Sequence, residues 1–162
     1  MVNKDPLKVM MFVCSGNTCR SPMAEGFMNH FLKIHGLDGI WGASSSGTMA
    51  IDGLPANGLA VRVMSENGID ISRHRSKPAG SWEPPEDSLF LGMTRDHVNC
   101  LRNLFPRRRG AVCLLGEASR PFYEGDILEV PDPFGGSLAS YREIAGVIRE
   151  MTMGLLNSLR DH

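Results

Sequence analysis

The stretch V-C-S-G-N-T-C-R-S-P-M-A-E, residues 13–25, joins a short apolar segment to the expected start of a helix. The apolar segment, L-K-V-M-M-F-V at residues 7–13, is typical of a strand buried on both faces. Ser is a favoured helix N-cap and Pro suits the first helical position, so Ser21 and Pro22 predict a helix that ends near Gly36. The sequence therefore predicts a strand, a loop of small polar residues and a helix in direct succession.

Strands and helices alternate through the rest of the chain. Apolar segments predict strands, and helical spacing predicts helices, over the following ranges: strands 40–45, 88–93 and 111–115, helices 56–67 and 94–104, and an irregular region at 120–131. Such alternation is typical of a parallel sheet covered by helices on both faces. We therefore expect an α/β fold, organised as a single three-layer domain over residues 1–162.

The last helix has the clearest pattern. From Leu138 to Leu159, apolar residues recur every three or four positions and form one stripe. Ser140 and Glu143 fit a capping box, so the regular turns should begin near Ser140.

Composition excludes several classes of protein. The chain has 162 residues, of which 42% are hydrophobic and 22% charged, which is ordinary globular usage. The formal net charge of -1 argues against a nucleic-acid partner, and the basic run at residues 107–109 should be a solvated loop. No segment approaches 18 apolar residues, and the first residues lack a signal peptide's apolar centre, so we expect no membrane contact and a cytoplasmic location.

Metal and cofactor chemistry is not expected either. The four cysteines, Cys14, Cys19, Cys100 and Cys113, do not have zinc-site spacing, and the five histidines are scattered. In a reducing compartment these cysteines should be free thiols.

The loop between the first strand and helix has the composition of an anion site. Successive backbone N–H groups in a loop containing Gly16 can form an anion-binding nest, and the helix N-terminus adds a positive dipole end. Arg20 can pair with two phosphate oxygens through its planar guanidinium group. Cys14 would lie within this field as a thiolate. Each residue alone is usually structural, but together at C-x5-R spacing they predict a nucleophile beneath a bound oxyanion.

At these residues the sequence resembles a known family. C-S-G-N-T-C-R-S-P-M-A-E is similar to the signature of the low-molecular-weight protein tyrosine phosphatases. Five further segments resemble family motifs in the right order: S-S-G-T (45–48), G-I-D-I-S-R-H-R (68–75), L-G-M-T (91–94), L-L-G-E (114–117) and V-P-D-P-F-G-G (130–136). The resemblance implies one α/β domain with a four-stranded parallel sheet. It also implies hydrolysis of phosphorylated protein residues through a phosphocysteine intermediate, with no cofactor.

The resemblance also assigns roles to individual residues. Cys14 would attack phosphorus, Arg20 would hold the phosphoryl oxygens, and Asp132 would protonate the leaving group and then activate water. Ser21 would hydrogen-bond the thiolate, and Asn17 would shape the loop. The residues implied to bind phosphate or substrate are Ser15, Gly16, Asn17, Thr18, Cys19, Ser21 and Phe134, with Ser45 and His74 as supports.

The position of Asp132 also has a local rationale. Double displacement needs an acid that becomes a base, which a carboxylate can supply. Asp132 lies between Pro131 and Pro133 and precedes Gly135 and Gly136, so one side of its loop is stiff and the other adaptable.

Three features resemble a branch of the family that dephosphorylates arginine. Thr18 stands where tyrosine-directed members often have a larger apolar residue, and Phe134 stands alone where they often have two adjacent aromatic residues. L-G-M-T, ending at Thr94, is also more like the arginine branch, whereas tyrosine-directed members commonly have an acidic residue at that position. An aromatic slot suits a phenyl ring, and a threonine hydroxyl suits a polar guanidinium group. These features favour phosphoarginine modestly over phosphotyrosine.

Alternatives remain open from the sequence. Thiol-dependent arsenate reductases share this fold and loop, but their relay cysteines are closer together than Cys100 and Cys113. A catalytically silent phosphate-binding module is a second alternative, which intact Cys14 and Asp132 disfavour. Cys19 could form a disulfide with Cys14 under oxidants, or only pack behind the loop.

Overall fold

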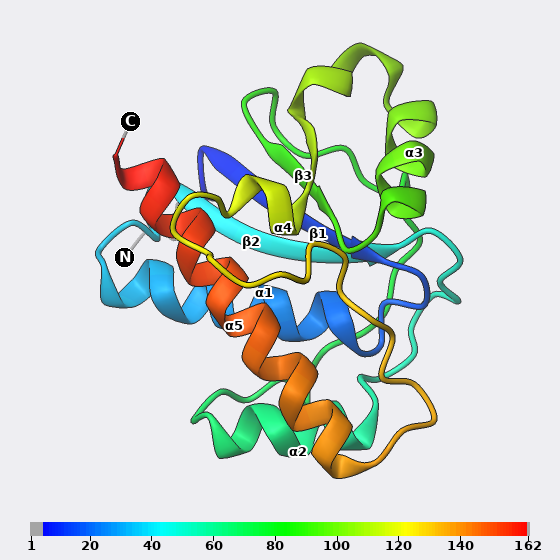
Figure 1. Ribbon diagram of the computed structural model, residues 1–162. Coiled ribbons are helices and arrows are strands. Elements are labelled where there is room, and N and C mark those ends of the chain that lie inside the picture. Colours follow the sequence, from blue (N-terminus) through cyan, green and yellow to red (C-terminus); the bar gives the residue numbers. More distant parts are fainter. Residues whose placement is uncertain (1–4, 162) are drawn as a thin grey trace.

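The computed structural model describes residues 5–161 and consists of a parallel sheet between layers of helices (Figure 1). The elements in chain order are β1 (Lys8–Cys14), α1 (Arg20–Ile34), β2 (Trp41–Gly47), α2 (Gly58–Glu66), β3 (Leu89–Gly92), α3 (Arg95–Leu104), the 3-10 helix η1 (Pro106–Ala111), β4 (Val112–Leu114), α4 (Leu115–Ala118) and α5 (Leu138–Arg160). The four strands are all parallel and lie in the order β2-β1-β3-β4. The predicted α/β fold with a four-stranded parallel sheet is confirmed.

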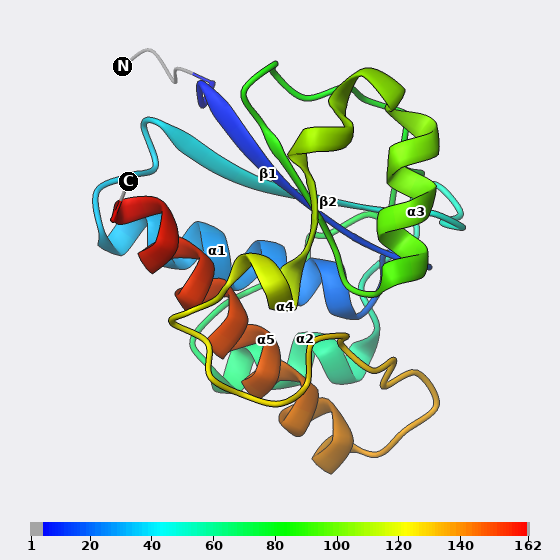
Figure 2. The ribbon, with the colours of Figure 1, turned by 45° about the horizontal axis from the view of Figure 1, so that its top comes forward.

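The two faces of β1 enter two different cores, as the period of a strand requires. Met10 and Phe12 pack with α1, α2 and α5, whereas Met11 and Val13 pack with α3. Figure 2 shows α1 and α5 on one side of the sheet and α3 on the other. Because β1 is central and buried on both faces, its carboxyl end is a rigid platform for the loop that follows.

Two helix starts differ from the sequence prediction. Helix α1 begins at Arg20 with Cys19 as its N-cap residue, so Ser21 and Pro22 already lie inside the helix. The hydroxyl of Ser21 contacts Cys14 instead of capping the helix. Helix α5 begins at Leu138, and its N-cap is Ser137, three residues before the predicted cap Ser140, because the Ser137 hydroxyl accepts the Ser140 N–H at 3.2 Å.

The region around β4 corrects two further expectations. The predicted strand over 111–115 is shorter, because Leu115 starts the short helix α4. The basic run is not simply a solvated loop, since it forms part of η1. Arg108 is half-buried, donates to the carbonyl oxygens of Pro84 and Pro85, and lies 5.3 Å from the Phe90 ring centroid. Arg107 and Arg109 are exposed, as expected for solvated side chains. Within residues 5–161, no helix has the length and apolar character needed to cross a bilayer.

Candidate active site

The site lies where β1 ends and α1 begins, at the carboxyl edge of the sheet. Cys14 is the last residue of β1, and the loop of residues 15–19 leads directly into Arg20 at the start of α1. Asn17 adopts a left-handed conformation with φ of 57°, which Asn tolerates better than most residues. Cys14 pairs with Gly47 on β2, so the neighbouring strand passes directly beneath the loop.

A chain of hydrogen bonds orients the hydroxyl of Ser21 toward the sulfur of Cys14. The Lys77 backbone N–H donates to Asn17 Oδ1 at 3.0 Å, which leaves Asn17 Nδ2 to donate to Ser21 Oγ at 2.8 Å. Ser21 Oγ lies 2.9 Å from Cys14 Sγ and 3.4 Å from the Ser46 carbonyl oxygen. Because the oxygen of Ser21 already accepts from Asn17, its proton is available to the nearer sulfur atom, Cys14 Sγ.

Arg20 provides a buried positive charge beside Cys14. Its Nη1 donates to the Val130 carbonyl oxygen at 3.0 Å, and its Nη2 lies 3.7 Å from Asp132 Oδ2. The Nε atom is buried and has no hydrogen-bond partner among the described residues. A buried guanidinium with an unused donor beside a helix N-terminus is suited to bind an oxyanion.

A cavity lies over Cys14 and Arg20, and Asp132 and Phe134 form its outer wall. The cavity has a volume of about 210 Å³, and its lining residues are Cys14, Gly16, Thr18, Cys19, Arg20, Asp132 and Phe134. The carboxylate of Asp132 is 54% exposed, and its Oδ1 accepts the Phe134 N–H at 3.0 Å. This turn holds the carboxylate at the cavity mouth while leaving it accessible to solvent, as a group that exchanges protons requires.

Of the two expected supports, His74 contacts the loop and Ser45 does not hydrogen-bond to it. His74 Nε2 donates to the Asn17 carbonyl oxygen at 2.7 Å, and its Nδ1 lies 3.8 Å from Glu25 Oε2. Ser45 is 1% exposed, and its hydroxyl has no partner among residues 5–161. The neighbouring Ser46 carbonyl provides the contact to Ser21.

Cys19 lies on the inner side of the loop. Its Sγ is 3.3 Å from the hydroxyl of Tyr141 on α5, and both side chains are buried. Burial raises the pKa of the Cys19 thiol, and burial also raises the pKa of Tyr141. Cys19 is therefore held in its neutral form, unlike a nucleophile.

Sequence reasoning missed His97, which connects the loop to α3. His97 Nε2 lies 2.9 Å from the Ser15 hydroxyl, and the Thr94 N–H donates to Nδ1 at 3.1 Å. Burial and the nearby Arg20 lower the pKa of His97 from 6.5 to about 4. The spacing of Thr94 and His97 is that of a capping box with His in place of Glu or Gln, and only that weak signal could have indicated the contact.

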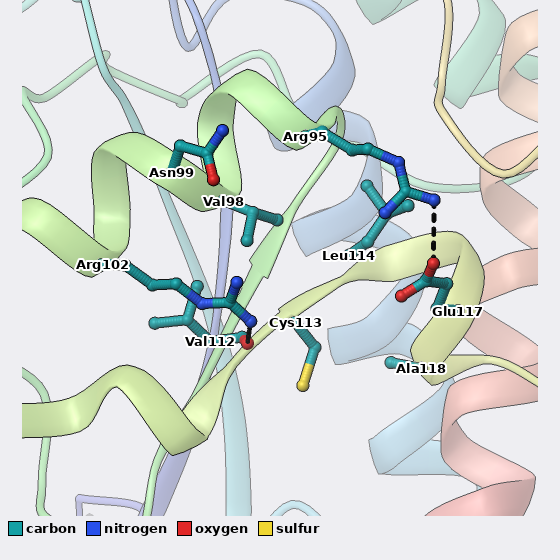
Figure 3. Close-up of a pocket in the computed structure, with 9 residues that line it drawn as sticks. All are labelled: Arg95, Val98, Asn99, Arg102, Val112, Cys113, Leu114, Glu117 and Ala118. Atoms are coloured by element: carbon teal, nitrogen blue, oxygen red, sulfur yellow. Dashed lines mark hydrogen bonds and ion pairs between the residues drawn. The ribbon is translucent and has the colours of Figure 1, made fainter.

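A second cavity, shown in Figure 3, lies between α3 and the β4–α4 segment. It has a volume of about 420 Å³ and contains Cys113, with an ion pair of 2.9 Å between Arg95 and Glu117 at one end. Cys113 lies two strands from β1 and does not line the cavity that contains Cys14. This placement gives no support to a cysteine relay from Cys14, as the arsenate reductase alternative would need.

Comparisons with known proteins identify the family to which the chain is similar. The family model described as "Low molecular weight phosphotyrosine protein phosphatase" matches residues 9–162. A protein-arginine-phosphatase of Bacillus subtilis is 32% identical over 93% of this chain and 96% of its own length. A probable low molecular weight protein-tyrosine-phosphatase, EpsP, of Ralstonia nicotianae is 32% identical over 88% and 90%. The crystal structure of a low molecular weight protein tyrosine phosphatase from T. tengcongensis is 36% identical, covering 92% of this chain and 97% of that one, with a TM-score of 0.80.

Proposed function

The chain belongs to the low molecular weight phosphotyrosine protein phosphatase family, and we propose that it acts on phosphoarginine in proteins in preference to phosphotyrosine. Its relatives are phosphatases, and this protein is a phosphatase enzyme. The relatives include both arginine and tyrosine phosphatases at equal identity, so the choice between them depends on the site itself.

In the proposed first step, the Cys14 thiolate attacks phosphorus and the bond from phosphorus to the leaving group breaks. Arg20 and the loop N–H groups neutralise the charge on the phosphoryl oxygens. Asp132 gives its proton to the leaving guanidino nitrogen, or to the phenolic oxygen of a tyrosine substrate. The products of this step are phosphocysteine, a free side chain and an Asp132 carboxylate.

In the second step, Asp132 takes a proton from water as the water oxygen attacks phosphorus. The S–P bond breaks, inorganic phosphate forms, and the thiolate of Cys14 returns. The hydroxyl of Ser21, 2.9 Å from the sulfur, stabilises the departing thiolate through a charge-assisted hydrogen bond. The four cysteines are free thiols in this structure, and we propose the reducing cytoplasm as the compartment in which Cys14 remains reactive.

The proposed preference for phosphoarginine over phosphotyrosine depends on the side chains that line the cavity. Thr18 places a small polar side chain on one wall, and among residues 5–161 Phe134 is the single aromatic residue that lines the cavity. Phe134 is also 73% exposed, so it provides one open edge and not a closed aromatic slot. The carboxyl group of Asp132 is 54% exposed, so it can reach the guanidino nitrogen of a substrate and donate its proton there.

A competition between two substrates tests this proposal. Matched peptides carrying phosphoarginine or phosphotyrosine should give a higher kcat/KM for phosphoarginine with the unmodified protein. Thr18→Ile should reverse or abolish this preference, because it removes the hydroxyl and enlarges the wall. Thr18→Val replaces the hydroxyl by a methyl group at similar volume, whereas Thr18→Ser keeps the hydroxyl but is smaller. Comparing the two variants separates the effect of side-chain polarity from that of side-chain volume. An unmodified protein that prefers phosphotyrosine would refute the proposed specificity.

A further inference from the structure

His97 forms hydrogen bonds with both ring nitrogens although it is 4% exposed. Nδ1 faces the backbone N–H of Thr94 at 3.1 Å, and this group can only donate. A neutral imidazole that accepts at Nδ1 carries its proton on Nε2. His97 Nε2–H therefore donates to the Ser15 hydroxyl, 2.9 Å away, and the tautomer follows from the backbone contact.

The backbone of His97 is held at the start of α3 by contacts with neighbouring residues. Thr94 Oγ1 accepts the His97 backbone N–H at 3.4 Å, which completes the capping box of α3. Gly92 leaves no spare room beside it, since an added Cβ would lie 3.2 Å from the Cβ of His97 and 3.0 Å from the backbone nitrogen of Val98. The same turn is tied to the site, because Met93 donates its N–H to the Val13 carbonyl at 3.0 Å.

Ser15 is the residue directly after the nucleophile, so its backbone N–H is the first that the anion-binding loop offers. We propose that His97 is a positioning residue: neutral and protonated on Nε2, it anchors Ser15 and thereby fixes the loop beside Cys14. This inference rests on the proposed use of the Cys14 loop in phosphoryl transfer, but it is independent of the choice between arginine and tyrosine.

Protonation would break this arrangement. A charged imidazolium donates from both nitrogens, so its Nδ1–H would face the Thr94 N–H, and the hydrogen bond that completes the cap and orients the ring would be lost. The groups near the ring are Arg20 from α1, Asp96 on α3, and Glu129 and Asp132 from the segment before α5. Burial and Arg20 outweigh the three carboxylates and lower the pKa of His97 to about 4, so the ring stays neutral at pH 7.

A double-mutant cycle on the full chain tests the anchor. His97→Asn retains an acceptor for the Thr94 N–H but cannot reach Ser15, and Ser15→Ala keeps the loop backbone. Each variant should lower kcat/KM for p-nitrophenyl phosphate by about 10- to 100-fold, because a small displacement of a catalytic loop has effects of that size. The double variant should lose no more than the larger single loss. His30→Asn, an exposed residue of α1, is the matched control and should be unaffected.

Imidazole ¹⁵N NMR of the unmodified protein gives an independent readout that a variant's folding cannot affect. We expect the Nε2-protonated form at pH 7, with a titration midpoint near pH 4. Additive losses in the cycle, normal kinetics of His97→Asn, or a proton on Nδ1 at pH 7 would overturn the inference. If instead the unmodified protein and Cys14→Ser show equal, background hydrolysis, the proposed function fails and not the anchor alone.

Discussion

Replacing Gly47 by Ala should displace the loop of residues 15–19, which we propose binds the phosphoryl group. An ideal Cβ at Gly47 would overlap the Ser15 carbonyl oxygen and would lie 3.0 Å from the Asn17 backbone nitrogen. Both neighbours are loop backbone, so the added methyl group can be accommodated only if the loop or β2 moves. The loop is also held to this strand, since the Thr48 N–H donates to the Cys14 carbonyl at 2.9 Å and the Met49 N–H donates to the Ser15 carbonyl at 2.9 Å.

The size of the effect follows from these contacts. A displacement of roughly 1 Å restores ordinary contact distances, and a misplacement of that size can lower catalysis about 100-fold. Overpacking of this kind costs about 1–3 kcal/mol of folding stability, so Gly47→Ala should still fold. We therefore expect a loss of about 100-fold in kcat/KM for p-nitrophenyl phosphate. Phosphate affinity, measured by calorimetry, should weaken in parallel.

Gly58→Ala is the matched control for this experiment. An added Cβ at Gly58, the first residue of α2, meets nothing within 4 Å, and Ala is the better helix former. Its kinetics should equal those of the unmodified protein, and urea unfolding should show equal or greater stability. A folded Gly47→Ala variant with kcat/KM within twofold of the unmodified protein would show that the loop does not depend on the close approach of β2.

Two further predictions follow from the hydrogen bonds of the site. Ser21→Ala removes a hydrogen bond to Cys14 that is charge-assisted when the sulfur is a thiolate and is worth about 1.5–3 kcal/mol. We therefore expect kcat to fall about 10- to 100-fold. A burst of released leaving group in stopped-flow assays would show that departure of the thiolate from phosphorus has become the slow step. Between the lowered pKa of His97, about 4, and its ordinary value of 6.5, the unfolded chain binds more protons than the native one. The free energy of unfolding should therefore fall by about 3 kcal/mol as pH drops through that window. Urea unfolding at a series of pH values measures this slope, which His97→Asn should flatten; an unchanged slope in that variant would assign the effect to other groups.

The sequence predicted those features that local pattern and chemistry determine. The run ending at Cys14 reads as a buried strand because both of its faces pack in a core. The C-x5-R spacing predicted the loop because the nucleophile and guanidinium must converge on one anion. The structure places Cys14, Arg20 and Asp132 around the same cavity, and their catalytic roles stay predictions.

Contacts between distant segments were beyond the reach of the sequence. Ser21 resembles an N-cap, but its hydroxyl contacts Asn17 and Cys14, and the helix begins two residues earlier than predicted, at Arg20. The pattern placed the cap of the last helix at Ser140, but the Ser137 hydroxyl accepts the Ser140 N–H, so the helix begins at Leu138. His97 is 82 residues from its partner Ser15, and no local pattern relates the two.

The loop of residues 15–19 is hydrogen-bonded to several other elements, whereas the cavity mouth, formed by Thr18, Asp132 and Phe134, has few such contacts. Backbone or side chains from residue 57 before α2, from residues 74 and 77, and from α3 all donate to the loop. At the mouth, Thr18 is half-buried and Phe134 is largely exposed, with Asp132 held mainly by its own turn and by Arg20. A change in the loop's shape therefore disturbs many partners at once, whereas a change at the mouth disturbs few. We therefore expect substitutions at Thr18 and Phe134 to alter substrate preference while leaving the hydrogen bonds of the loop intact.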